Sequence, residues 1–225
     1  MDRPIVSKPL VDQVYDAILS DICEGRFASG CRIRQEDLAA KFGVSRQPVI
    51  QALRLLKAQG FLEPHRRKGL QVAGLDPRMV RNLYEVREAL ERVAITRAAA
   101  APPAFLRSEA EAAIAEGRRA VAEDSAQGLL EADLRFHSAL WEAGGNPLIG
   151  EAIRGHWAHL RWAMRNVLEL RGYGEQVQCE HEALLEAVCA GEGARAADLM
   201  EQHLRNAGAK VIRELEGSDR AAKAA

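Results

Sequence analysis

The segment from residue 35 to residue 72 constrains the fold of this chain most, because it places helix, turn and strand signals close together. Apolar residues on one side predict a short helix over 35–42, and Gly43 ends it. Ser45 then offers a hydroxyl that can cap a second helix. Pro48 falls in the first turn of that helix, where its missing N–H costs little. Two short helices around such a glycine turn predict a helix-turn-helix.

The residues on both sides extend this pattern. The second helix continues to about residue 59, and Gly60 ends it. Residues 61–65 and 70–72 predict two short strands around a basic tip, Arg66-Arg67-Lys68-Gly69. A preceding helix over 10–24 carries an apolar residue at every fourth position, namely Leu10, Val14, Ile18 and Ile22. Together these elements predict a winged helix-turn-helix, whose last helix would enter the major groove while the hairpin reaches toward phosphates or the minor groove.

A change of pattern at residues 74–77 divides the chain. Beyond it the periodicity is helical throughout, without strand-like alternation. Asp76 can cap a long helix that has Pro77 at its first position. We therefore expect a mainly α fold with three parts: a winged helix-turn-helix domain over 1–73, a linker over 74–77, and an all-helical domain over 78–225.

Glycine and proline residues divide the second domain into the helices that we expect there. These cover residues 77–101, 104–122, 126–143, 147–171, 174–190 and 192–216. The inner stripe of the first of them is formed by Val80, Leu83, Val86, Arg87, Leu90 and Ala94. Residues 220–225 have nothing to pack against, so we expect this tail to fray.

The charge of the chain is distributed unevenly. Residues 1–75 carry 12 basic and 8 acidic residues, whereas residues 76–225 carry 19 basic and 24 acidic residues. Residues 41–70 contain seven basic residues and a single acid, Glu63. Such a basic segment on an otherwise acidic protein is a candidate surface for phosphate groups, and a solvated charged face is the alternative.

Composition excludes several classes of protein. No apolar run approaches the roughly 20 residues that a membrane span needs. The first residues lack the basic and then apolar layout of a secretory signal, so we expect a cytoplasmic protein without membrane contact. The four cysteines form no CxxC pair, which argues against a disulfide framework or a cysteine zinc site.

Two groups of motifs resemble a known family. Residues 38–49 (LAAKFGVSRQPV) and 52–62 (ALRLLKAQGFL) are similar to the helix-turn-helix signature of GntR-type transcription regulators. The second domain resembles the ligand-sensing domain of the FadR/FCD branch. Its cues are LYEVR at 83–87, DLRFH at 133–137, Glu180-His181 and His203-Leu204, in that order. The resemblance covers residues 8–216 and implies a homodimeric, DNA-binding regulator, a repressor by the habit of the family.

Several residues are candidates for DNA contact. Arg46 lies at the N-terminal end of the predicted recognition helix, where arginine can donate two hydrogen bonds to guanine. Gln47 and Gln51 can pair with adenine, and Ser45 and Lys68 suit phosphates. The wing tip adds His65, Arg66 and Arg67, for which a position merely near the backbone is the alternative. The family usually has Arg-Glu where this chain has Ile50-Gln51, so an operator sequence from relatives is not expected to transfer. Two-fold symmetry of a dimer predicts a pseudo-palindromic operator.

Asp133 and His137 are four residues apart and share one helix face, where each can offer a metal ligand. A surface ion pair or a core histidine satisfied by a carboxylate is the alternative. The resemblance adds His181 and His203, which match the remaining ligands of the family. Three imidazoles and one carboxylate suit a first-row transition ion, Zn²⁺ or Ni²⁺ above all.

The resemblance also implies an effector, a small carboxylate that completes the coordination of the metal. Arg87 matches an arginine that holds an anionic ligand in relatives, and its planar fork suits that role. The alternative is an ion pair with Glu91 on an exposed face, or with Glu88. A metal-free pocket for an acyl chain is another possible design of such a regulator.

A metal-dependent hydrolase is the third alternative. The chain has no HExxH, GxSxG or P-loop motif. Glu180 and Glu182 flank His181 but point away from its helix face, so neither supplies a general base. We therefore do not expect an enzyme.

Overall fold

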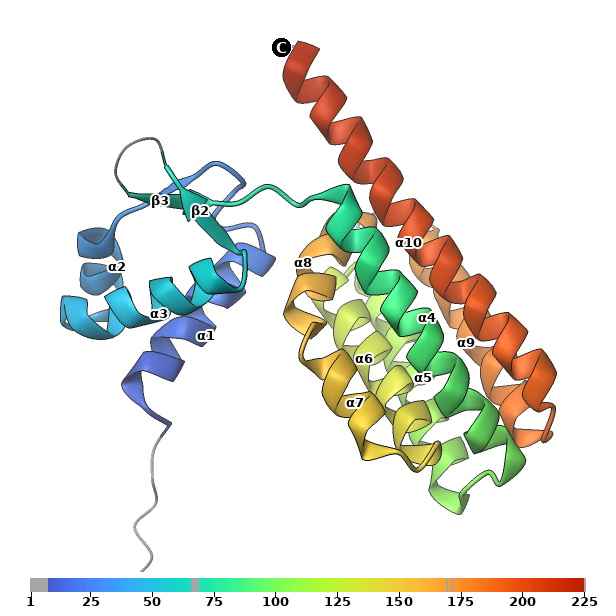
Figure 1. Cartoon of the computed structure of the whole chain (residues 1–225). Helices are drawn as coiled ribbons and strands as arrows, with labels where there is room; N and C mark the ends of the chain where they lie inside the picture. Colours follow the sequence, from blue (N-terminus) through green and yellow to red (C-terminus); the bar gives the residue numbers. More distant parts are fainter. Residues whose placement is uncertain (1–7, 66–68, 169, 171, 225) are drawn as a thin grey trace, which may run out of the picture. The chain divides into compact units, whose positions relative to one another are not determined.

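The computed structural model describes residues 8–65, 69–168, 170 and 172–224. The chain divides into two compact units, Met1–Leu75 and Asp76–Ala225 (Figure 1). Among the described residues, the first unit contains three helices and a small sheet, and the second contains helices joined by loops, without a strand. This is the mainly α class that the sequence predicts.

The first unit has the elements of a winged helix-turn-helix. They are α1 (Leu10–Cys23), β1 (Arg32–Ile33), α2 (Gln35–Phe42), α3 (Arg46–Ala58), β2 (Leu62–Pro64) and β3 (Leu70–Val72). The sheet is antiparallel in the order β1-β3-β2, with Leu62 opposite Val72. Strand β1 was not predicted, because two residues are too few to show an alternating pattern. It forms because Ile33 is buried and β3 offers it an unpaired edge.

The core of this unit lies between α1, α3 and the sheet. Its buried side chains include Val14, Ile18, Val49, Leu53, Leu56, Phe61 and Val72. Two expectations are corrected. Leu10 is 49% exposed, because it opens α1 before the helix reaches its neighbours. Ser45 does occupy the N-cap position of α3 with an extended backbone, but its hydroxyl makes no capping hydrogen bond.

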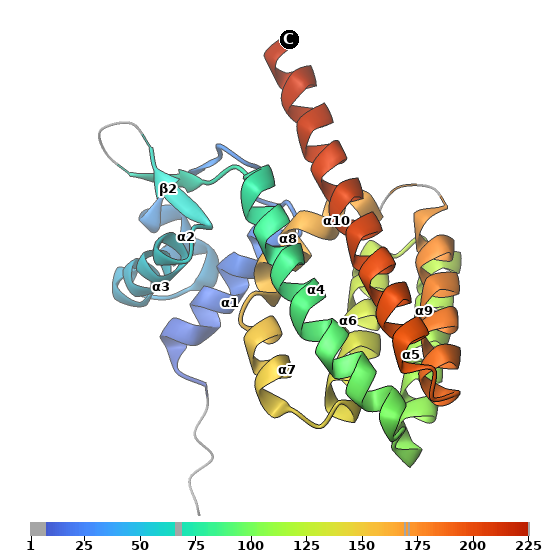
Figure 2. The ribbon, with the colours of Figure 1, turned by 45° about the vertical axis from the view of Figure 1, so that its right-hand side comes forward.

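The second unit is a bundle in which helices distant in sequence lie side by side. Its elements are α4 (Pro77–Ala100), α5 (Ala104–Ala122), α6 (Ala126–Ala143), α7 (Pro147–Arg154), α8 (Trp157–Leu168), α9 (Tyr173–Cys189) and α10 (Gly193–Ala224). Helices α4 and α10 run beside each other in both ribbon views, and α5 packs against α6 and α9 (Figure 2).

Two helices of this unit differ from the prediction. The helix expected over 147–171 is broken at Gly155, where the N–H of His156 bonds to the carbonyl of Ile153 and so tightens the turn. The carbonyl of His156 then accepts from Leu160, within the first turn of α8. Helix α10 continues to Ala224, beyond the end predicted at residue 216, because residues 220–224 (RAAKA) are strong helix formers.

Helix α4 presents one buried face to the bundle. Asp76 caps it as predicted, since its side chain accepts a hydrogen bond from the N–H of Arg78. The buried face carries Val80, Tyr84, Arg87, Glu91, Ala94, Ile95, Ala98 and Ala99. Val86 was expected on this face but is 47% exposed, and Tyr84 occupies the inner position instead. None of the helices in the described part of the chain is long and apolar enough to cross a membrane.

Candidate metal centre

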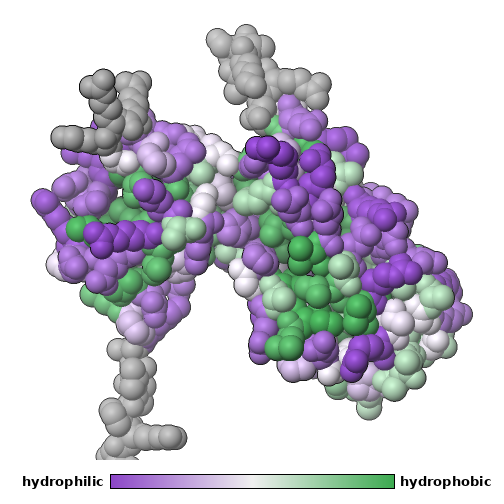
Figure 3. All heavy atoms as spheres, in the orientation of Figure 1, coloured by the Kyte–Doolittle hydropathy of each residue, from purple (hydrophilic) through white to green (hydrophobic). Residues whose placement is uncertain are grey.

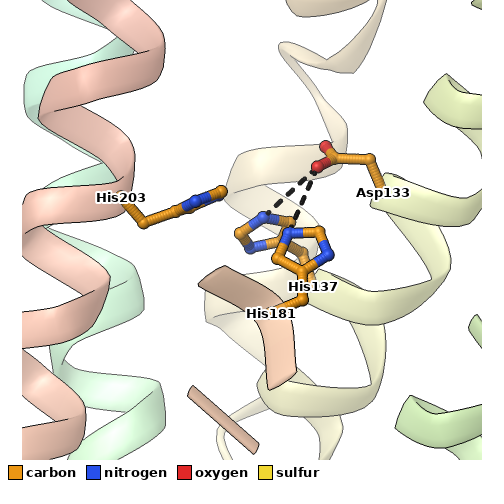
Figure 4. Close-up of side chains that lie close together, drawn as sticks. All are labelled: Asp133, His137, His181 and His203. Atoms are coloured by element: carbon orange, nitrogen blue, oxygen red, sulfur yellow. Dashed lines mark ion pairs between the residues drawn. The ribbon is translucent and has the colours of Figure 1, made fainter. Parts of the chain in front are cut away.

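Four side chains from three helices meet inside the second unit. Asp133 and His137 come from α6, His181 from α9 and His203 from α10 (Figure 4). One ligand atom of each lies within 4.8 Å of those of the others, and all four residues are at most 4% exposed. The fold therefore brings together the set that the sequence predicts, because the bundle aligns the inner faces of α6, α9 and α10.

Three of the four candidate ligands, Asp133, His137 and His181, each have a buried polar atom without a hydrogen-bond partner. Oδ1 of Asp133 lies 3.7 Å from Nε2 of His137 and 3.5 Å from Nε2 of His181. Neither separation is a hydrogen bond. Oδ2 of Asp133 and both Nε2 atoms are buried without any hydrogen-bond partner. Buried polar atoms without partners are costly, and a cation shared by all of them would satisfy these lone pairs. The residues present therefore fit a metal ion.

Two of the imidazoles are held by carboxylates from neighbouring helices. Nδ1 of His137 donates to Glu91 over 2.5 Å, and Nδ1 of His203 donates to Glu180 over 2.7 Å. These bonds place the proton on Nδ1 and leave the Nε2 lone pair free for a metal. Neither of these two bonds was predicted from the sequence. Glu180 does point away from the face of His181, as predicted, but it thereby reaches the histidine of α10.

His181 is held by packing. Its ring stacks on Phe136, with centroids 3.9 Å apart and an angle of 12° between the planes. Burial, together with the neighbouring His203, His137 and Arg87, keeps the pKa of His181 well below its ordinary value. The imidazole is therefore neutral at physiological pH, which is the form that binds a metal.

Arg87 lies beside this cluster. Its Nε donates to Oε1 of Glu91 over 2.7 Å, and both side chains are at most 3% exposed. The ion pair that the sequence suggested is thus present, but in the core rather than on an exposed face. Nη2 of Arg87 is buried without a partner. A buried arginine with a free donor can bind an anion.

Two further buried polar side chains near the cluster, Tyr84 and Gln178, were not predicted from the sequence. Arg87 lies over the ring of Tyr84, 5.5 Å from its centroid, and the Tyr84 hydroxyl has no partner. Burial raises the pKa of Tyr84 to about 12, so this hydroxyl remains protonated. Gln178 is buried with a free Oε1 and packs against Gly117, where any larger residue would collide with it. Each lies three residues from a predicted site residue, Arg87 or His181, and that spacing was the available signal.

The candidate DNA contacts lie in the first unit. Ser45, Arg46, Gln47 and Gln51 are exposed at the N-terminal part of α3. Nη1 of Arg46 lies 3.5 Å from Glu36 of α2, and the arginine side chain is 66% exposed. His65 contacts Gln71 through its Nδ1 atom. Arg66, Arg67 and Lys68 lie outside the described residues.

Comparison with models of protein families shows the family to which the chain belongs. A model described as the FCD domain matches residues 82–206, which is more than half of the chain, and one described as bacterial regulatory proteins of the gntR family matches residues 10–72. The chain belongs to the gntR family of bacterial regulators, in its FCD-domain branch. It is therefore a DNA-binding transcriptional regulator and not an enzyme.

Relatives of this gntR-family protein are similar over much of its length. The HTH-type transcriptional repressor RspR of Escherichia coli is 25% identical over 88% of this chain and 87% of its own. A regulator from Streptomyces ambofaciens is 28% identical over 79% of this chain and 75% of its own. The Bacillus subtilis regulator YdhC is 36% identical, but the match spans only 41% of that protein.

Two solved structures have the same fold. A regulator from Rhodococcus sp. RHA1 superposes with a TM-score of 0.76 at 22% identity, covering 91% of this chain and 98% of its own. The Escherichia coli protein McbR/YncC gives a TM-score of 0.75 at 19% identity, covering 93% and 99%.

Proposed function

We propose that the helical unit of this gntR-family regulator binds a divalent metal and a small organic acid, and that the acid controls operator binding. The observation that carries this proposal is the cluster of unpartnered ligand atoms on Asp133, His137 and His181, next to the free Nη2 of Arg87.

Asp133, His137, His181 and His203 would hold the metal. Imidazole nitrogens with one carboxylate favour a first-row transition ion, and we propose Zn²⁺ or Ni²⁺. Bound there, the ion would supply a Lewis-acidic position for an oxygen of the acid. The protein supplies the Nε2 lone pairs, the oriented imidazoles and a site shielded from water.

Arg87 would hold the carboxylate of the acid. Glu91 occupies only its Nε, so the Nη2 edge remains available for an anion. Within the buried set, Arg87 offsets the charge of Glu91, and a divalent cation would exceed the charge of Asp133. An added anion is therefore favoured over a neutral ligand. A metal-free pocket for an acyl chain would need an apolar lining, which these buried polar residues do not provide.

In the first unit we propose that α3 reads the operator. Arg46, Gln47 and Gln51 would contact base edges, while Ser45, His65, Arg66 and Lys68 would contact the backbone. Control requires that the acid bind the DNA-competent and incompetent arrangements with different affinity. We propose repression that the effector relieves, because two relatives are named repressors, RspR and a regulator of D-xylose utilization.

We further propose that the regulator is a homodimer on a pseudo-palindromic operator. Val86 and Val93 of α4 are 47% and 48% exposed, and Leu148 of the adjacent α7 is 67% exposed. Figure 3 shows hydrophobic residues gathered on the face of the unit that α4 and α7 cover. Such an exposed apolar face suits contact with a second copy.

A thermal-shift screen tests the proposal directly. Metal-analysed protein is mixed with acetate, L-lactate, malonate, citrate and gluconate, with and without prior chelation. A binder at a hundred times its dissociation constant stabilises by about 2.7 kcal/mol. We expect a shift that disappears on chelation. A shift that survives chelation would place the pocket away from the four ligands, and no shift with metal present at about one ion per chain would leave the metal a structural role only.

A further inference from the structure

Glu91 forms hydrogen bonds to both halves of the proposed site. Its Oε1 accepts from Nε of Arg87 over 2.7 Å, and its Oε2 accepts from Nδ1 of His137 over 2.5 Å. The residue is 1% exposed. Both carboxylate oxygens are thus committed, one to the candidate acid-binding arginine and one to a candidate metal ligand.

We propose that Glu91 is a positioning residue that orients His137 toward the metal and Arg87 toward the acid, so that one buried carboxylate links the two binding events. This inference rests on the function proposed above. It goes further in assigning the coupling to a single residue that belongs to neither ligand set.

The hydrogen-bond chemistry explains why only a carboxylate serves at this position. Arg87 Nε–H and His137 Nδ1–H are both donors, so the group between them must accept twice. A glutamine has one acceptor and one donor end. With its oxygen toward Arg87, its NH₂ would force the proton of His137 onto Nε2, which removes the lone pair that a metal would need. With its oxygen toward His137, its NH₂ would face Nε of Arg87 and turn the guanidinium.

The position of Glu91 in the bundle supports the same role. Arg87 and Glu91 are one turn apart on α4, whereas His137 lies on α6. The carboxylate of Glu91 therefore forms a direct hydrogen bond between α4 and α6. With a metal held at its Nε2, His137 would be a stronger Nδ1–H donor, and its bond to Glu91 would hold the carboxylate that aligns Arg87. Metal occupancy would thereby prepare the arginine for the acid.

Two other glutamates provide matched controls. Glu180 also accepts from a candidate ligand, His203, but its second oxygen is bound by Gln176 and not by an arginine. Glu88 lies on α4 three residues before Glu91 and pairs with Arg205, whose side chain is 61% exposed. Glu180→Gln therefore disturbs a metal ligand without disturbing Arg87, and Glu88→Gln changes the same helix without touching the site.

The experiment uses the full-length protein with Zn²⁺ and acetate as probes. Zinc affinity is measured by competition with a chelator, and acetate affinity is measured at saturating zinc. We expect Glu91→Gln to weaken zinc binding by about 10- to 100-fold and to weaken acetate binding as well. Glu180→Gln should weaken zinc binding alone, and Arg87→Ala should weaken acetate binding alone. Glu88→Gln should change the binding of neither probe. ¹⁵N NMR of the histidine rings should show His137 of metal-free Glu91→Gln shifted toward the Nε2–H tautomer.

The outcomes separate this inference from the function on which it rests. If Glu91→Gln binds zinc as the wild type does, or binds acetate normally once zinc is saturating, Glu91 does not link the two ligands. If the wild type binds no zinc, the proposed function fails and this inference fails with it. Should Glu91→Gln not fold, Glu91→Asp retains the charge for Arg87 but is too short to serve both donors, and the same pattern of losses is expected.

Discussion

In the helical unit the side chains of the candidate site are buried, whereas in the DNA-binding unit they are exposed. Arg87, Glu91, Asp133 and the three histidines are each at most 4% exposed. Ser45, Arg46, Gln47 and Gln51 all face solvent. Asp21 is the single buried charged residue among the described residues of the first unit.

This difference fits the sizes of the two partners that we propose, a DNA duplex and a small organic acid. A duplex can be met only at the surface, so its contacts leave no trace in the packing of the protein. A small ligand is enclosed, and its site must keep polar atoms in the core at a cost in stability. In the helical unit, unpartnered buried atoms therefore indicate where a ligand could bind. In the DNA-binding unit, the candidate contacts are inferred from the fold and the family.

The largest expected effect is the loss of bound metal from the helical unit when candidate metal ligands are removed. In His181→Ala with His203→Ala, two of the four candidate donors are lost, so we expect bound metal to fall from about one ion per chain to none. Metal analysis after dialysis measures this. Operator affinity of the metal-free protein should equal that of chelated wild type. A double variant that retains full occupancy would refute the assignment of the site.

Arg46→Ala should weaken operator recognition by the DNA-binding unit and leave metal binding by the helical unit unchanged. The loss of a bidentate contact to guanine costs about 1–3 kcal/mol of discrimination. Fluorescence anisotropy measures the affinities for an operator duplex and for a scrambled duplex. The ratio of the operator affinity to the scrambled-duplex affinity should fall by roughly 5- to 150-fold. Zinc affinity should not change. Arg54→Ala, farther along the same helix, is the control, and an equal loss there would show that only general charge is being measured.

Asp21 tests whether the first unit also depends on a buried charge. Arg26 and Lys41 donate to this carboxylate, and although burial raises its pKa, these two donors lower it overall. Because the folded pKa lies below the unfolded value of about 3.9, the contribution to stability is present at neutral pH and is lost as the pH falls below about 4.

Asp21→Asn should destabilise the first unit by about 1–2 kcal/mol, since both cations are half-exposed and partly screened. Hydrogen exchange of α1 amides should show this loss at pH 7, while amides of α9 should not change. A loss that persists unchanged below pH 3 would contradict the ionic origin.

The smallest expected effect is at the start of α4. Asp76→Ala removes the cap on Arg78 N–H and should cost about 1 kcal/mol of the stability of the second unit. Thermal unfolding detects this, and Asp76→Ser should recover most of it. If Asp76→Ala leaves the unfolding temperature unchanged, the cap contributes nothing there.

Local signals explain which parts of the fold could be predicted. Helix α2 and strand β3 have the expected bounds because Gly43 and the basic hairpin tip mark their ends. Gly155 was harder to interpret, since a lone glycine is tolerated inside many helices. Val86 was misplaced because a stripe of apolar residues does not show which of its edges meets a neighbour.

The site could be predicted only as far as motifs reach. Asp133 and His137 share a face by spacing, and His181 and His203 came from the family resemblance. The bonds of Glu91 to His137 and of Glu180 to His203 could not be assigned, because they depend on how α4 lies against α6 and how α9 lies against α10. Successive residues point about 100° apart around a helix, so Glu180 could face one neighbour while His181 faces another.

Helix α4 has a mechanical consequence for control. It contains no glycine or proline after Pro77, so nothing in its sequence provides a hinge. Arg87 lies ten residues from Pro77, a separation of about 15 Å. A tilt that begins where a ligand meets Arg87 would therefore reach the start of α4 without being absorbed on the way. In the proposed mechanism the helix would act as a stiff rod, with the candidate acid-binding arginine partway along it and the chain that leads to the DNA-binding unit attached at its end.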